Sequence, residues 1–196
     1  MVTIAFFDFD GTITRKDTLW EIIRFHRGSA ALYAGIIQLL PALVRFKLKM
    51  ISAQQVKEQV LGYYFGGIHT SAFKRSCEEF CRTKLHEVIR PKALAAIKDH
   101  QQKGHHVVVV TASGQDWVAP WCRVLNIVCI GSQLEAVDQH ITGNLLGKNC
   151  NGEEKVDRIR KAYRLENFKE IYAYGDTKGD LPMLELAQHR FFKPFR

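Results

Sequence analysis

The chain alternates between short, continuous apolar runs and longer segments in which apolar residues recur every three or four positions. The short runs predict buried strands, and the longer segments predict helices. Strands that alternate with helices indicate a parallel sheet covered by helices on both faces. The predicted strands span 2–7, 105–113, 126–132 and 170–176, and the predicted helices between and after them span about 91–104, 115–125 and 153–163.

A second pattern interrupts this alternation after the first strand. Residues 15–88 contain only helical periodicity, with capping boxes at Thr18–Glu21 and Ser52–Gln55. We therefore expect an inserted helical cap of three or four helices at 15–88, and a core domain formed by 1–14 and 89–196. Within the core, residues 132–147 predict a hairpin, Pro182 a short helix and 190–195 a last strand.

The charge balance narrows the class of partner. The 196 residues carry a formal net charge of +8, and the sequence pI is about 9.3. This balance fits either an ordinary basic soluble protein or a protein that binds phosphate groups on a metabolite or an anionic membrane. Nucleic acid is not expected as a partner, because no basic run with interleaved aromatic residues occurs.

The most apolar stretch covers residues 31–44. It is too short to span a bilayer, and Pro41 interrupts it. Arg45, Lys47 and Lys49 follow it, so the segment is either a helix buried in the cap or a helix that lies on a membrane surface.

The cysteines bear on the cellular compartment. Their number, five, is odd, and their spacing is not that of metal ligands. This pattern argues against a disulfide framework and a zinc site, so we expect a cytoplasmic protein, with peripheral contact to the membrane as the alternative.

Polar residues gather where the predicted parallel strands end. Asp8 and Asp10 follow the first strand, Thr111 and Ser113 end the second, and a later strand leads into Asp176 and Asp180. Ligands of open parallel sheets bind at this edge. The four carboxylates would repel one another there unless a hard cation such as Mg²⁺ lay between them. Lys155, at the start of a helix, would complete a phosphate-binding site with a hydroxyl group.

The spacing of Asp8 and Asp10 suits acid–base and nucleophilic chemistry. Side chains two positions apart in an extended segment point the same way, so both carboxylates can flank one reacting atom. One can attack phosphorus, and the other can donate a proton to the leaving oxygen and later accept one from water. Gly11 lets the chain turn away at once.

Four segments in this order resemble the motifs of the haloacid dehalogenase-like (HAD) superfamily. They are "DFDGT" at 8–12, "VVVVTAS" at 107–113, the lysine of "GEEKV" at 152–156, and "YGDTKGD" at 174–180. The chain is most similar to the phosphoserine-phosphatase-like branch (subfamily IB), which carries a helical cap after the first motif. The resemblance implies a Rossmann-like three-layer core with a central parallel sheet and an inserted α-helical bundle cap.

The resemblance also implies a role for each motif residue. Asp8 would be the nucleophile that forms an aspartyl-phosphate, and Asp10 the general acid and base. Lys155 would hold the nucleophile and neutralise phosphate charge. The segment Thr111-Ala112-Ser113 would bind the phosphoryl group. The Mg²⁺ site would comprise Asp8, Asp10 through its backbone carbonyl, Asp176 and Asp180, where Asp180 supports the metal shell or orients Lys155.

Two residues bear on the substrate. Asp17 stands where phosphoserine phosphatases resemble one another in having a glutamate that faces the substrate amine, but it is equally suited to begin a helix. Arg45 lies in a segment that resembles the source of their carboxylate-binding arginine, but a solvated basic face is an equal interpretation. Thr111-Ala112-Ser113 replaces their Ser-Gly-Gly run, which leaves the identity of the substrate open.

We therefore predict a Mg²⁺-dependent phosphomonoester hydrolase that acts on a small phosphorylated metabolite such as phosphoserine. The alternatives are a lipid-phosphate phosphatase similar to phosphatidylglycerophosphatases at the membrane surface, and a phosphotransferase. A phosphate-binding module without catalysis is the least favoured, because the acid pair and Lys155 are intact.

Overall fold

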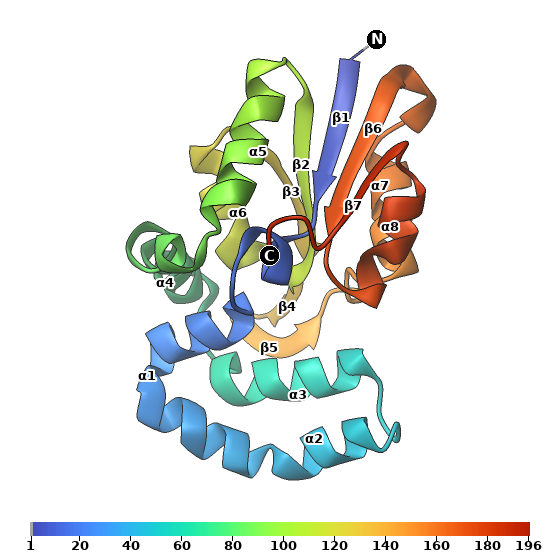
Figure 1. Cartoon of the computed structure of the whole chain (residues 1–196). Coiled ribbons are helices and arrows are strands. Elements are labelled where there is room, and N and C mark those ends of the chain that lie inside the picture. Colours follow the sequence, from blue (N-terminus) through green and yellow to red (C-terminus); the bar gives the residue numbers. More distant parts are fainter. Residues whose placement is uncertain (1) are drawn as a thin grey trace.

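A five-stranded parallel sheet forms the centre of the computed structural model, which describes residues 2–196 (Figure 1). The strand order is β3-β2-β1-β6-β7, so β1 and its terminal acid lie in the middle of the sheet. The strands are β1 (Val2–Phe7), β2 (His106–Gly114), β3 (Val128–Ser132), β6 (Phe168–Gly175) and β7 (His189–Phe192). The predicted central parallel sheet is confirmed.

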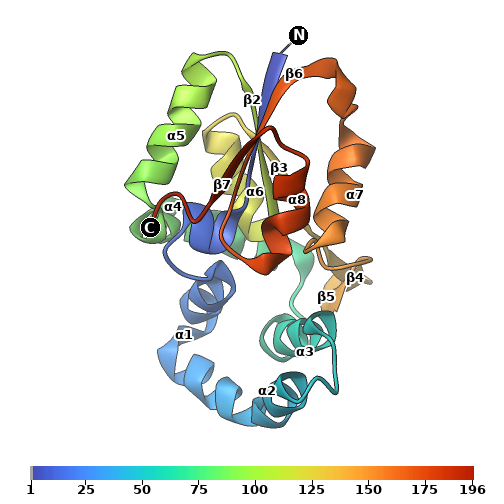
Figure 2. The ribbon, with the colours of Figure 1, turned by 45° about the vertical axis from the view of Figure 1, so that its right-hand side comes forward.

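Helices cover both faces of the sheet (Figure 2). Along β1, Ala5 and Phe7 pack on the side of α5 (Pro91–Gln102) and α6 (Gln115–Val124). The alternate residues Ile4 and Phe6 pack on the side of α7 (Glu153–Ala162) and α8 (Leu181–Glu185). Both sets are fully buried, which explains why β1 reads as a continuous apolar run without alternation.

Four helices between β1 and α5 form a separate group, which we call the cap. They are α1 (Thr18–Gln38), α2 (Leu40–Lys47), α3 (Ala53–Phe65) and α4 (Thr70–Thr83). In Figures 1 and 2, α1, α2 and α3 form an open loop of helices beyond the carboxyl ends of the strands. The division of the chain at residues 15 and 88 stays a prediction.

The start of the first cap helix differs from the sequence pattern, whereas the interruption at Pro41 agrees with it. Asp17 is the N-cap residue of α1 and accepts a hydrogen bond from the backbone N–H of Leu19, so the predicted capping box at Thr18 was wrong by one residue. The predicted box at Ser52 and Gln55 is present. Pro41 lies in the first turn of α2, and the helix direction bends by 55° between α1 and α2.

A hairpin joins the cap to the sheet region. Strands β4 (Leu134–Val137) and β5 (His140–Leu145) pair antiparallel, as predicted for 132–147, and β5 packs against α3. The last strand is shorter than predicted, because the chain leaves the sheet after Phe192. The remaining helical segments are a tight turn at Phe9–Ile13 and 3-10 turns at Leu85–Val88, Leu165–Asn167 and Lys178–Asp180.

Candidate active site

Asp8 lies at the middle of the sheet edge where the parallel strands end. Its backbone N–H continues the β1–β6 ladder by donating to the Tyr174 carbonyl oxygen at 2.9 Å. The chain then turns sharply through Gly11, which has φ +83°. A Cβ on Gly11 would lie 2.5 Å from an Asp176 carboxylate oxygen, so only glycine fits here. The turn therefore brings the first motif directly against the acid that follows β6.

Lys155, in the first turn of α7, links Asp8 to Asp180, an acid in the turn after β6. Its Nζ donates to Asp8 Oδ1 at 2.6 Å, to Asp180 Oδ1 at 2.7 Å and to the Val110 carbonyl oxygen at 2.8 Å. Burial opposes the charge of Lys155, but the carboxylates of Asp8 and Asp180 outweigh it and hold its pKa above the ordinary value. All three donors of the ammonium are thus used, and the lysine stays charged in a buried position.

Burial and the charge of Lys155 also act on the pKa values of Asp8 and Asp180, and they shift these two pKa values in opposite directions. Burial raises the pKa of Asp8 to about 7, although Lys155 lowers it. Burial would also raise the pKa of Asp180, but Lys155 and the hydrogen bonds from Thr177 hold it below its usual value. Asp180 Oδ2 accepts the backbone N–H groups of Asp176 and Thr177 at 3.1 and 2.9 Å, so this side chain fixes the turn after β6.

Three carboxylates, one after β1 and two in the turn after β6, form a cluster that fits a metal ion. Asp8, Asp176 and Asp180 are all buried, and each offers an oxygen within 4.8 Å of the other two. Carboxylate oxygens are the donors that hard divalent cations prefer. Asp176 also accepts from Thr12 Oγ1 at 3.3 Å and forms an ion pair with the guanidinium of Arg196.

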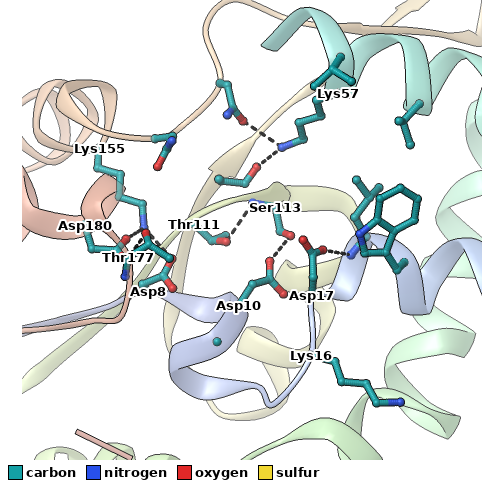
Figure 3. Close-up of a pocket in the computed structure, with 18 of the residues that line it drawn as sticks. Asp8, Asp10, Lys16, Asp17, Lys57, Thr111, Ser113, Lys155, Thr177 and Asp180 are labelled. Atoms are coloured by element: carbon teal, nitrogen blue, oxygen red, sulfur yellow. Dashed lines mark hydrogen bonds and ion pairs between the residues drawn. The ribbon is translucent and has the colours of Figure 1, made fainter. Parts of the chain in front are cut away.

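The side chain of Asp10 lies apart from this carboxylate cluster, on the cap side of the site (Figure 3). Its Oδ1 accepts the Thr18 N–H at 2.8 Å, and its Oδ2 accepts a hydrogen bond from Ser113 Oγ. Ser113 Oγ also contacts Thr18 Oγ1, which in turn accepts from the indole N–H of Trp117 at 3.1 Å. Burial raises the pKa of Asp10 to about 6, against these hydrogen bonds, so the group is suited to exchange protons near neutral pH.

The segment Thr111-Ala112-Ser113 lies between Asp8 and the cap. The Thr111 hydroxyl accepts the Ser113 N–H at 2.9 Å, so its own O–H remains to donate to a ligand. The Ala112 carbonyl oxygen accepts from Ser132 Oγ at 2.7 Å. These contacts hold the segment against the sheet edge beside Asp8.

These groups line a pocket of about 490 Å³ between the sheet edge and the cap. The cap side of this pocket has an apolar wall, made of Leu19, Trp20, Leu43, Phe46, Val56 and Val60. Asp17 also lines the pocket while it caps α1, so its two interpretations are compatible. Burial raises the pKa of Asp17.

The structure does not bring Arg45 into this pocket. Arg45 is exposed on α2 and lines a separate surface hollow with residues of α3 and β5. The cation that extends from the cap into the pocket is Lys57 of α3 (Figure 3). The sequence reasoning missed Lys57 and the Trp117–Thr18 contact, because helical periodicity does not show which polar face turns toward the core. It also missed Asn149, which lies in the loop after β5 and carries no pattern that places it.

Comparison with known proteins agrees with this geometry. The site consists of a lysine-bridged acid cluster at the carboxyl ends of the parallel strands of an α/β fold, with helices above it. The model of the haloacid dehalogenase-like hydrolase family matches residues 5–185, and the chain belongs to this family.

Named relatives support the same class. Protein CicA of Caulobacter vibrioides is 32% identical over 192 residues, which cover 97% of this chain and 85% of that protein. A histidinol-phosphatase of Neisseria meningitidis is 24% identical, over 95% of this chain and 88% of that protein. The similarity to named phosphatases confirms the prediction of a HAD-type phosphatase.

The fold matches solved structures of the predicted branch. The structure of a substrate-bound phosphoserine phosphatase superposes with a TM-score of 0.69 at 16% identity, and covers 98% of this chain and 86% of that chain. The similarity confirms the predicted α/β fold, with a central parallel sheet between layers of helices.

Proposed function

We propose that this protein hydrolyses a small phosphorylated metabolite through an aspartyl-phosphate on Asp8. The observation that carries the proposal is the buried ion pair between Asp8 and Lys155 at the end of the central strand. A carboxylate that is merely structural gains nothing from facing a ligand pocket, whereas a nucleophile must face its substrate. The second oxygen of Asp8 is free of Lys155, and we assign the attack to it.

Two steps complete the reaction. Asp8 attacks phosphorus, the bond from phosphorus to the substrate oxygen breaks, and Asp10 donates a proton to that oxygen as the alcohol leaves. Water then attacks phosphorus, Asp10 accepts its proton, and the bond to Asp8 breaks to release inorganic phosphate. Lys155 and the Thr111 hydroxyl neutralise the charge on the phosphoryl oxygens throughout.

Asp8, Asp176 and the backbone carbonyl of Asp10 would hold a Mg²⁺ ion, and Asp180 would support it by orienting Lys155. Bound Mg²⁺ would supply positive charge to the phosphoryl oxygens and favour the ionised form of Asp8. The chain's own contribution is to hold Asp8, Asp176 and Asp180 close together, with their oxygens within 4.8 Å of one another.

The test is hydrolysis of p-nitrophenyl phosphate. The wild type is measured with Mg²⁺ and with EDTA, and the Asp8→Asn variant is measured with Mg²⁺. We expect turnover with Mg²⁺, loss of turnover in EDTA, and no turnover by Asp8→Asn with an unchanged circular dichroism spectrum. The matched control is Asp99→Asn, which alters an exposed acid on α5. Normal turnover by Asp8→Asn would disprove the assignment of the nucleophile. Added alcohols test the phosphotransferase alternative, which predicts new phosphate esters among the products.

One surface feature favours a second substrate class, a lipid phosphate at an anionic membrane surface. Residues 22–57 contain no acidic residue. Along α1, α2 and the loop that follows, large apolar side chains are 49% to 71% exposed, namely Tyr33, Ile37, Leu40, Val44, Leu48 and Met50. Arg45, Lys47 and Lys49 are exposed among them. An apolar surface with cations at its edge is typical of interfacial helices.

The membrane candidate has its own test. Within residues 2–196 no single helix is long and apolar enough to cross a membrane, and the bent pair α1–α2 meets that length and composition test only jointly. We therefore test contact with the membrane surface by pelleting the protein with anionic and neutral vesicles. Recovery in the supernatant with both would reject this candidate and leave the cytoplasmic location predicted from the sequence.

A further inference from the structure

The tail, which we define as residues 193–196, returns from the sheet to the acid cluster. The chain leaves β7 after Phe192 and turns at Lys193, which has a positive φ of 55°. The Lys193 N–H donates to the Gly175 carbonyl oxygen at 2.8 Å. In Figures 1 and 2 the tail then reaches the tight turn that follows β1. The tail therefore lies at the same edge of the sheet as the candidate metal site.

An aromatic stack fixes the path of the tail. The centroid of the Phe195 ring lies 5.6 Å from that of Tyr174, and the two ring planes differ by 13°. Phe191 of β7 also stacks on Tyr174, with 4.6 Å between the centroids. Tyr174 lies two positions before Asp176, and Arg196 directly follows Phe195. The stack therefore places the side chain of Arg196 beside that acid.

Arg196 is the cationic partner of Asp176. Its guanidinium forms an ion pair with Asp176 Oδ2. Lys155 is paired with the other two acids of the cluster, Asp8 and Asp180. A buried carboxylate is costly unless a cation or hydrogen bonds compensate its charge. The three acids therefore share two cations, and Arg196 compensates the third acid.

The two partners of this ion pair differ in exposure. The Asp176 side chain is 4% exposed, whereas the Arg196 side chain is 49% exposed. A guanidinium that leaves the carboxylate regains water, but the carboxylate does not. Arg196 can therefore release Asp176 to another cation that binds the carboxylate more strongly.

We propose that Arg196 competes with the divalent cation for Asp176, so that the tail sets the metal concentration at which the site fills. The proposal rests on the metal site of the proposed function. Binding of an ion by Asp8 and Asp176 would bring a second positive charge to the carboxylate that the guanidinium contacts. Two cations so close together repel each other, and the half-exposed guanidinium is the one that can move into solvent.

This competition has to be mutual. When two ligands share one group, the factor by which the first weakens the second equals the factor by which the second weakens the first. Removal of the guanidinium should therefore tighten metal binding, and metal binding should release the guanidinium from Asp176. These are two separate measurements that have to agree.

Calorimetric titration with Mg²⁺ and with Mn²⁺ gives the first measurement. Arg196→Met removes the guanidinium, and Arg196→Lys keeps a positive charge at the same place. The matched control is Lys178→Met, which removes the charge of an exposed lysine in the turn between Asp176 and Asp180. Circular dichroism checks that each variant is folded.

We expect Arg196→Met to bind both ions about 5- to 100-fold more tightly than the wild type does. Arg196→Lys should remain closer to the wild type. Lys178→Met should change the affinity less than about 3-fold, because solvent and salt screen an exposed charge. Equal gains for Arg196→Met and Lys178→Met would overturn the proposal, and so would unchanged or weaker binding by Arg196→Met.

NMR of the protein with isotope-labelled arginine gives the second measurement. The side-chain N–H signal of Arg196 is assigned by its absence from the spectrum of Arg196→Lys. Saturating Mg²⁺ should move this signal to the position typical of a solvent-exposed arginine. A signal that stays in place while calorimetry shows a bound ion would contradict the proposal, because Asp176 would then hold both cations at once.

Neither measurement requires turnover, so this proposal and the proposed function can fail separately. Turnover that needs Mg²⁺, together with equal metal affinities of the wild type and Arg196→Met, overturns only the competition. Absence of divalent cation binding in the wild type and in every variant overturns the metal site and the competition together.

Discussion

Lys155 and Asp8 form a buried ion pair of 2.6 Å between residues 147 positions apart in sequence. The side chains are 1% and 8% exposed, so neither charge has solvent to stabilise it alone. Asp180 shares the same ammonium at 2.7 Å. One cation therefore serves two acids, and the contact joins β1, α7 and the turn after β6 at a single point.

Removing this cation should destabilise the fold as well as stop the reaction. With divalent cations chelated, we expect Lys155→Met to lower the free energy of unfolding by about 3–5 kcal/mol at pH 8, because two buried acids lose their partner. The loss should shrink at pH 5, where the acids can take up protons. Urea unfolding at both pH values measures it.

The control for this prediction is Lys103→Met. Lys103 pairs with Asp99 at 2.7 Å, but both side chains are more than half exposed. Exposed pairs contribute about 0–1 kcal/mol, so this variant should unfold almost as the wild type does. Equal effects of the two substitutions would show that the buried Lys155 pairs contribute no more to the free energy of unfolding than the exposed Lys103–Asp99 pair does.

Asp10→Asn should slow the enzyme in a way that depends on the leaving group. An alkyl phosphate needs a proton on its departing oxygen, so its kcat should fall by about 10²–10⁴-fold without the acid. p-Nitrophenyl phosphate has a stable leaving anion and should lose less in the first step. Pre-steady-state rates of phosphoenzyme formation from both substrates isolate this first step, and equal losses there would leave Asp10 no role as the acid beyond its contact with the Thr18 N–H.

Gly11→Ala tests the close approach between the first motif and Asp176. Gly11 and Gly104 both have positive φ, +83° and +72°, but a Cβ on Gly104 would meet nothing within 4 Å. Gly104→Ala should therefore cost about 1–2 kcal/mol of backbone strain alone. Gly11→Ala should cost more in chemical unfolding, and it should also weaken Mg²⁺ binding measured by thermal shift. Equal costs would mean that Asp176 moves aside freely.

His100 should make the fold sensitive to acid. Its ring is buried, with Nε2 2.9 Å from the Tyr174 hydroxyl and Nδ1 2.7 Å from a His105 nitrogen. Burial, and then His105, lower the pKa of His100 to about 4 from an ordinary value of 6.5. Below pH 6.5 the unfolded chain takes up this proton more readily than the folded one, so stability should fall as the pH falls toward 4.

His100→Gln removes this titration. We expect the melting temperature of the variant to change less between pH 7 and pH 4.5 than that of the wild type. Calorimetric scans at matched ionic strength provide the measurement. A slope as steep as that of the wild type would place the acid sensitivity elsewhere.

The sequence by itself determined the strands, the cap helices and the acids at the sheet edge. Those features depend on local pattern: an apolar run of about six residues makes a buried strand, and a residue just after a parallel strand must lie at its carboxyl edge. Asp8, Thr111 and Asp176 could therefore be brought together on paper before any coordinates existed. Asp180 and Lys155 followed from the order of the motifs.

Only the tertiary structure decided which cap residue reaches the pocket. Lys57 lies on a predicted helix and Arg45 follows the apolar stretch 31–44, and the family resemblance pointed to Arg45. The bend between α1 and α2 and the ties between α3 and the loop after β5 turn Arg45 outward and Lys57 inward. Such orientations depend on contacts between segments about 90 residues apart, which local periodicity does not encode.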